Sequence, residues 1–231
     1  MTADSTTVTV TMWSDLGCPW ATLALDTLHA EARRLDVELV IDHRAFPLEL
    51  FNKMPTPKHI VESEIVAIAG RVPELGWRLW QAPAYTYPVT MLPAMEAVQA
   101  AKAPAVGGLV GSDELDTALR RAYLVDSRCV SVPSVILEVA DECPLVNTDQ
   151  LAGAIAEGKG RAEIYRDWQE AKRVPIQGSA TLFRADAEPL HNPGARYSWS
   201  KPGGPSEGGF PVLESYSRDW AAGLLDGTGS G

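Results

Sequence analysis

The chain has 231 residues, of which 45% are hydrophobic and 22% are charged, and its formal net charge is −10. This length is enough to bury a substantial core, and the composition is ordinary for a globular protein. An acidic chain without a basic stripe is not expected to bind nucleic acid. No stretch approaches the roughly 20 apolar residues of a membrane helix, and no secretory signal is visible. We therefore expect a cytoplasmic protein with no membrane partner.

Cysteine is rare in this chain, which has only Cys18, Cys129 and Cys143. Three dispersed cysteines suit a reducing compartment and do not predict a disulfide framework. The four histidines are scattered, and no Cys and His residues have the spacing of a zinc site. We expect no metal.

The amino-terminal part of the chain predicts a β-α-β unit. Residues 6–13, TTVTVTMW, alternate and are rich in β-branched residues, which is typical of a strand. Residues 19–35 have apolar side chains at helical spacing, with Pro19 in the first turn. Residues 37–48 predict a second strand, which a right-handed crossover would place parallel to the first.

The rest of the chain is mostly helical by its pattern. Segments with helical periodicity, separated by Pro- and Gly-bearing turns, are residues 56–72, 93–103, 112–125, 132–143, 147–158 and 161–174. They are followed by a predicted β-hairpin at 179–192, a Gly- and Pro-rich loop at 193–211, a last helix at 212–225 and a tail at 227–231 that we expect to be disordered.

This order of elements predicts a thioredoxin-like α/β fold with a helical insertion. We place the thioredoxin-like domain at residues 6–53 and 159–226, and the helical insertion at residues 54–158. The chain would then return to its first domain after the insertion.

Cys18 lies between the first strand and the first helix. The unpaired N–H groups and aligned peptide dipoles of a helix N-terminus favour a thiolate, whereas a free cysteine has a pKa of about 8.5. We therefore expect a lowered pKa and a reactive thiol at Cys18, with Trp20 shielding one side. A lone cysteine is also often a small buried hydrophobe. The residues alone leave both interpretations open.

The segment SDLGCPWATLAL, residues 14–25, resembles the active-site segment of the DsbA-like thioredoxin-fold family. The resemblance is to its cytoplasmic branch, which includes FrnE-type oxidoreductases and 2-hydroxychromene-2-carboxylate isomerases. Further segments resemble that branch in the same order, at residues 42–50, 118–140, 174–183 and 190–194. The resemblance extends from about residue 7 to about residue 225 and implies the same fold.

The resemblance implies that Cys18 is catalytic, and that contacts to a substrate or thiol come from Ser14, Asp15, Pro19, Trp20, Ser179 and Ala180. The chain departs from the family pattern twice. Ala21 stands where redox-active relatives have a second, resolving cysteine, and Ala180 stands where the family has a cis-proline. A non-prolyl cis bond costs about 2.5–4 kcal/mol, so a trans peptide bond with a reshaped loop is one alternative at Ala180, and the sequence leaves the isomer open.

Three functions remain open for such a chain. The first is a thiol-disulfide oxidoreductase that uses Cys18 as a monothiol. Its resolving partner would be a low-molecular-weight thiol such as glutathione or mycothiol, and its substrates small-molecule or protein disulfides. The second is an isomerase or kappa-type transferase that acts on a small organic molecule with a bound thiol cofactor. The third is a non-catalytic binding module. The oligomeric state is open.

We expect the substrate to lie in a cleft between the two subdomains, bounded by Cys18, Trp20 and the Ser179–Ala180 loop. The aromatic segment WRLWQAPAYTYP, residues 77–88, is a candidate roof for this cleft, although packing between the subdomains is an alternative. Asp15 and His43 stand at strand ends and are candidates to face the site.

Overall fold

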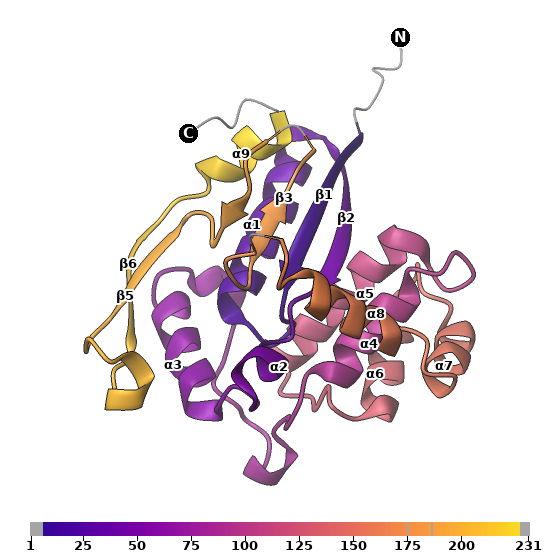
Figure 1. Ribbon diagram of the computed structural model, residues 1–231, viewed down its shortest axis with the longest axis horizontal. Coiled ribbons are helices and arrows are strands. Elements are labelled where there is room, and N and C mark those ends of the chain that lie inside the picture. The colour runs from indigo at the N-terminus through magenta and orange to yellow at the C-terminus, as the bar shows by residue number, and fades with distance from the viewer. Residues whose placement is uncertain (1–6, 175, 186, 227–231) are drawn as a thin grey trace.

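The structure is a computed structural model, and it describes residues 7–174, 176–185 and 187–226. The predicted disorder of residues 227–231 therefore concerns residues outside the described ones. Figure 1 shows a twisted sheet with helix α1 along one face and a group of helices, α4 to α8, beside it. No helix within the described ranges is both long enough and apolar enough to cross a bilayer.

The predicted β-α-β unit is confirmed. Strand β1 (Thr7–Ser14) runs parallel to β2 (Glu38–Ala45), with Thr7 opposite Glu38 and Ser14 opposite Ala45. Helix α1 (Pro19–Leu35) connects them and ends at Asp36, whose φ of 54° lies in the left-handed region. The first half of β1 alternates between exposed and buried residues, but its last three residues are all buried. The chain therefore enters the interior just before Cys18.

The predicted hairpin is also confirmed, and it completes a four-stranded sheet of order β2-β1-β3-β4. Strand β3 (Thr181–Phe183) pairs antiparallel with β1 on one side and with β4 (Leu190–His191) on the other. The pairing of Trp13 with Thr181 brings the loop before β3 next to the end of β1. This loop contains Ser179 and Ala180.

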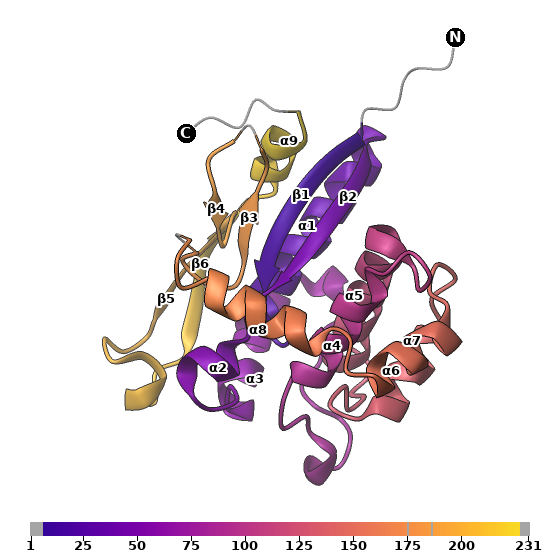
Figure 2. The same cartoon turned by 45° about the vertical axis from the view of Figure 1, so that its right-hand side comes forward.

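Most predicted helices are confirmed within a few residues. Between β2 and β3 the chain forms α2 (Leu48–Asn52), α3 (Lys58–Ala69), η1 (Pro73–Leu75), η2 (Ala84–Thr86), α4 (Leu92–Ala101), α5 (Gly108–Leu124), α6 (Pro133–Ala140), α7 (Thr148–Ala156) and α8 (Arg161–Glu170). Helices α4, α5 and α8 pack against β2, and α3 packs against α1. Figure 2 shows α8 crossing below the ends of β1 and β2. One continuous hydrophobic core extends from the sheet and α1 into these helices.

Two predictions near the carboxyl end are wrong. The predicted loop contains strand β5 (Ala195–Trp199) and the short helix η3 (Gly204–Glu207), and the predicted last helix begins instead as strand β6 (Pro211–Tyr216). The two strands form a separate antiparallel sheet, because their aromatic and β-branched residues suit paired strands. Helix α9 (Asp219–Asp226) follows and packs against α1.

Candidate functional site

Cys18 is the N-cap residue of α1, with φ −83° and ψ 115°. Its N–H donates to the Asp15 carbonyl at 3.2 Å, and its carbonyl accepts the first helical hydrogen bond from the Thr22 N–H at 3.1 Å. Pro19 fills the first helical position, where a missing N–H costs no helical hydrogen bond. The thiol Sγ donates to the Ser179 carbonyl oxygen at 3.4 Å. Local sequence thus places the thiol against the loop before β3.

A cleft of about 640 Å³ opens beside this thiol. Four of the predicted site residues line it together, namely Cys18, Pro19, Trp20 and Ser179. Its other walls come from the segment between α2 and α3, from α3 itself, and from the β5 and η3 region. The cleft therefore lies between the start of α1, helix α3 and the β5–β6 hairpin.

The other three predicted site residues lie behind the cleft, and none of them lines it. The Asp15 carboxylate accepts the backbone N–H groups of Gly17 and Leu48, both at 2.8 Å. The Asp15 N–H in turn donates to the Ser179 Oγ at 2.9 Å. Ser14 is buried and Ala180 is fully buried. In this structure Asp15 ties the turn before Cys18 to the loop that faces it.

The Ser179–Ala180 peptide bond, whose isomer the sequence left open, is cis. Backbone and side-chain hydrogen bonds hold this loop. The Ala180 N–H donates to the Asn192 Oδ1 at 3.0 Å, and the Ala180 carbonyl accepts from the Asn192 N–H at 3.0 Å. Asn192 has φ 41°, in the left-handed region. Asn192 thus binds both sides of Ala180.

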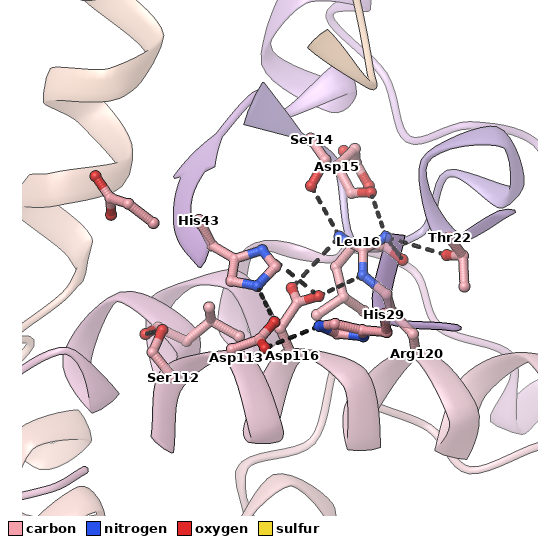
Figure 3. A network of polar contacts seen from close by, with 12 residues as sticks. Ser14, Asp15, Leu16, Thr22, His29, His43, Ser112, Asp113, Asp116 and Arg120 are labelled. Carbon is pink, nitrogen blue, oxygen red and sulfur yellow. Dashed lines mark hydrogen bonds and ion pairs between the residues drawn. The ribbon is translucent and has the colours of Figure 1, made fainter. Parts of the chain in front are cut away.

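Arg120 of α5 is 1% exposed and holds the turn before Cys18 from below (Figure 3). Its Nη1 donates to the carbonyls of Asp15 at 3.2 Å and Leu16 at 3.3 Å, and its Nη2 donates to the Ser14 Oγ at 2.8 Å. Its charge is balanced by Asp116, whose Oδ2 lies 2.5 Å from the Arg120 Nε. A buried charge needs such pairing. Arg120 is therefore the link between α5 and the Cys18 turn.

His43 belongs to this buried network and does not face the cleft. It is 2% exposed, and its Nε2 lies 2.8 Å from Asp113, which also contacts the His29 Nε2 at 2.9 Å. Burial alone would raise the pKa of Asp113, but hydrogen bonds from His29 and His43 outweigh it and hold that pKa below its usual range. Within the described part of the chain, no three His, Cys, Asp or Glu side chains are grouped to hold a metal ion.

The predicted low pKa of Cys18 is wrong. Burial raises the pKa of the thiol to about 12, and the negative charge of Glu64 adds to this rise. Hydrogen bonds from Ser179 and the Ala21 N–H oppose it without cancelling it. Desolvation of the buried thiolate is the largest cause, and the Ala21 N–H of the first helical turn does not offset it.

Glu64 is the acidic group in the cleft lining. Burial raises the pKa of its carboxyl to about 7, and the nearby Trp20 indole opposes this rise. Trp20 is 3% exposed and its indole stacks on the Tyr197 ring with centroids 4.2 Å apart. The cleft thus combines a thiol, a carboxyl and an aromatic wall.

The aromatic segment 77–88 does not roof the cleft, since none of its residues lines it. Trp80 and Tyr87 pack instead against Tyr123 of α5, with ring centroids 6.2 and 6.0 Å from Tyr123. The Tyr87 and Tyr123 hydroxyls are 2.5 Å apart. These contacts lie within the helical part, whereas the alternative interpretation placed the segment between the two subdomains.

The site residues that were not predicted from the sequence include Glu64, Arg120 and Tyr197. Arg120 had a signal, because Ser112, Asp116 and Arg120 recur every four residues on the otherwise apolar face of α5. Glu64 lies on an ordinary amphipathic helix, which gave no signal. Tyr197 lay in a segment predicted to be a loop.

No protein-family model matches this sequence, and no curated protein sequence matches it. Solved structures do resemble it. The cytosolic disulfide reductase DsbM of Pseudomonas aeruginosa has a TM-score of 0.61 and 20% identity, over 80% of this chain and 89% of the reductase. DsbM has also been solved with glutathione.

Two further structures share the fold. A protein of Nitrosomonas europaea whose proposed class is protein disulfide isomerase has a TM-score of 0.65 and 12% identity, over 96% of this chain and 97% of its own. A 2-hydroxychromene-2-carboxylate isomerase has a TM-score of 0.56 and 13% identity, over 79% and 87% of the two chains. These neighbours are DsbA-like proteins, so the thioredoxin-like fold with a helical insertion is confirmed.

Proposed function

We propose that this protein is a cytoplasmic thiol-disulfide oxidoreductase in which Cys18 is the single reactive thiol and a low-molecular-weight thiol is the resolving partner. The observation that carries the proposal is the position of Cys18 in the cleft wall, facing the backbone of Ser179. The Ser179 N–H donates to no acceptor in the residues that the structure describes. A bound thiol or disulfide can therefore accept it.

The chemistry has two exchange steps. The Cys18 thiolate attacks one sulfur of a disulfide, a new bond joins the two sulfurs, and the other half leaves as a thiolate that takes up a proton. A second small thiol then attacks the mixed disulfide, which restores Cys18 and releases a new disulfide. Ala21, which is fully buried beside Cys18, cannot perform this resolution, so the second thiol has to come from outside.

The shared fold supports a thiol as partner. The reductase DsbM is described as cytosolic and has been solved with glutathione. The raised pKa of Cys18 keeps the free thiol protonated near neutral pH, because only a small fraction ionises so far below the pKa. We therefore propose slow exchange at pH 7 that accelerates as the pH rises.

A second candidate is a thiol-dependent isomerase or transferase for a small organic molecule. Two observations favour it, the largely apolar lining of the cleft and the protonated state of Cys18. A protonated Cys18 could donate its S–H to the thiolate of a bound cofactor. Its role would then be to position that cofactor, with no covalent step of its own.

The mass of the intact protein tests both candidates. After incubation with a small disulfide at pH 8.5, we expect one adduct, which is lost in Cys18→Ser and kept in Cys129→Ser. An adduct on Cys129 alone, or none, contradicts the oxidoreductase proposal. Turnover of a small-molecule substrate that survives in Cys18→Ala identifies the second candidate.

A further inference from the structure

The lining of the Cys18 cleft contains one carboxyl group and no guanidinium or ammonium group among the described residues. The carboxyl group belongs to Glu64. His59 lies at the exposed start of α3 and is the only other ionisable group of the lining apart from Cys18 and Tyr197. A ligand with carboxylate groups would find no guanidinium or ammonium partner here.

Three basic residues on neighbouring segments pair with groups outside the cleft. The Lys58 Nζ lies 3.2 Å from Glu62, and the Lys201 Nζ donates to the Glu207 carbonyl at 2.8 Å. Arg196, next to Tyr197, pairs with Glu214 at 3.2 Å on the neighbouring strand. Lys53 is exposed and does not line the cleft. The positive charges near the cleft are therefore not directed into it.

The charge of Glu64 acts on the other groups of the cleft. It contributes to the raised pKa values of both Cys18 and Tyr197, so its field opposes negative charge on the thiol and on the aromatic wall. Asp15, behind the turn, adds to the same effect at Cys18. An incoming carboxylate would meet this field in a partly desolvated site, where like charges repel more strongly than in water.

The remaining walls are suited to an uncharged ligand. Apolar contact comes from Met54, Pro55, Ile60 and Val61 and from the stacked Trp20 and Tyr197 rings, and hydroxyl groups come from Thr56 and Ser206. The indole N–H of Trp20 is buried and lies beside the Glu64 carboxyl, whose pKa it lowers.

We propose that Glu64 makes this cleft selective for thiols and disulfides that carry no carboxylate group, with an apolar or hydroxyl-bearing body, and against anionic ones such as glutathione. This inference rests on the proposed function. The reaction is the same thiol-disulfide exchange as in the proposed function. The inference adds only that the two halves of the disulfide carry no negative charge.

Three small disulfides of similar size test the selectivity. They are bis(2-hydroxyethyl) disulfide, which is uncharged, 3,3′-dithiodipropionate, which is a dianion, and cystamine, which is a dication. The rate at which each modifies Cys18 is followed by intact mass at pH 8, where Glu64, with a pKa of about 7, is mostly ionised. We expect the dianion to react about tenfold more slowly than the uncharged disulfide, and the dication at least as fast.

The matched variants are Glu64→Gln and Glu62→Gln, both on α3. Glu62 does not line the cleft and pairs with Lys58. We expect Glu64→Gln to bring the rates with the dianion and the uncharged disulfide to within about threefold, mainly by accelerating the dianion. Glu62→Gln should leave their ratio unchanged. If the dianion and the uncharged disulfide react at equal rates in the unaltered protein, the inference is overturned. It is also overturned if Glu64→Gln does not alter the ratio of these two rates.

A binding measurement separates this inference from the proposed function. Glutathione and its diethyl ester differ in their carboxylates, and their binding to Cys18→Ser is measured by calorimetry without any exchange chemistry. We expect tighter binding of the ester and a smaller difference in the Cys18→Ser/Glu64→Gln double variant. If no disulfide modifies Cys18 but the ester still binds more tightly, the oxidoreductase proposal fails and the selectivity stands. Equal binding of the two overturns the selectivity.

Discussion

Trp20 and Tyr197 lie face to face, with ring centroids 4.2 Å apart and ring planes inclined by 6°. This contact joins the first turn of α1 to strand β5, from a separate sheet. It forms a wall of the cleft beside Cys18. The β5–β6 hairpin is thus part of the site.

We expect Tyr197→Ala to lower the free energy of unfolding by about 2 kcal/mol, because it removes a stacked ring and its buried area. Tyr197→Phe keeps the ring and should cost less than about 0.5 kcal/mol. Urea denaturation measures both. Equal costs for the two variants would show that stacking on Trp20 contributes little.

Arg120→Leu should destabilise the protein by about 3–5 kcal/mol, since it leaves Asp116 buried without its ion-pair partner. The neighbouring Arg121 side chain is 69% exposed, so Arg121→Leu is the control and should change stability by less than about 0.5 kcal/mol. If Arg120→Leu does not fold, Ser14→Ala removes one acceptor of Arg120 and should cost about 1 kcal/mol. A Ser14→Ala variant as stable as the unaltered protein would argue against this role of Arg120.

The alkylation rate of Cys18 should rise with pH up to at least pH 10 without levelling off, because its pKa is raised to about 12. Site-resolved mass spectrometry after iodoacetamide treatment measures the rate at Cys18. A plateau with a midpoint at or below about 8.5 would show that the helix N-terminus dominates after all.

Ala21→Cys should place a second thiol one helical turn from Cys18 and allow an intramolecular disulfide. Reduction of a protein disulfide by dithiol turnover should then increase several-fold over the unaltered chain, which depends on an external thiol for resolution. Ala24→Cys, also buried on α1, is the control for adding a thiol elsewhere. Turnover by the unaltered protein that equals that of Ala21→Cys would contradict the monothiol mechanism.

Stability should fall as the pH rises from about 4.5 to 7.5. Burial raises the pKa of Asp15 to about 6 and that of Glu64 to about 7, so the folded chain binds these protons more tightly than the unfolded chain. Their contribution is complete below the ordinary carboxyl pKa of about 4 and is lost as the pH rises through 6 to 7. Asp113 has a lowered pKa, so its ionisation makes the stability rise with pH. This effect falls at lower pH than that of Asp15 and Glu64.

Urea midpoints at a series of pH values measure this slope. Glu64→Gln should reduce the loss of stability between pH 4.5 and 7.5 by about 2 kcal/mol, because glutamine does not titrate. A pH profile unaffected by Glu64→Gln would mean that this carboxyl is better solvated than its place in the cleft implies.

The elements that could be predicted from the sequence are those whose periodicity is local. The alternation of residues 7–13 and the helical spacing of residues 19–35 each indicate one structure, and both are confirmed. Residues 195–199 and 211–216 were missed, because their pairing spans a Gly- and Pro-rich segment and is visible only in the folded chain. Segments with long-range partners depend on tertiary context.

The same distinction applies to the site. The position of Cys18 at the start of a helix follows from the residues around it. Its pKa depends on burial and on Glu64, a residue of another helix with no pattern that connects it to the thiol. The four-residue spacing of Asp116 and Arg120 on α5 was visible in the sequence. The sequence did not indicate that Arg120 holds the turn at Asp15 and Leu16.

The hydrogen bond from the Ala180 N–H to Asn192 has an evolutionary consequence. A proline at residue 180 would have no N–H to donate, so the Asn192 side chain would lose this partner and its identity would be less constrained. A chain that exchanges proline for alanine here gains a buried donor, which needs an acceptor. We therefore expect residues 180 and 192 to covary among homologues, with asparagine at 192 accompanying the absence of proline at 180.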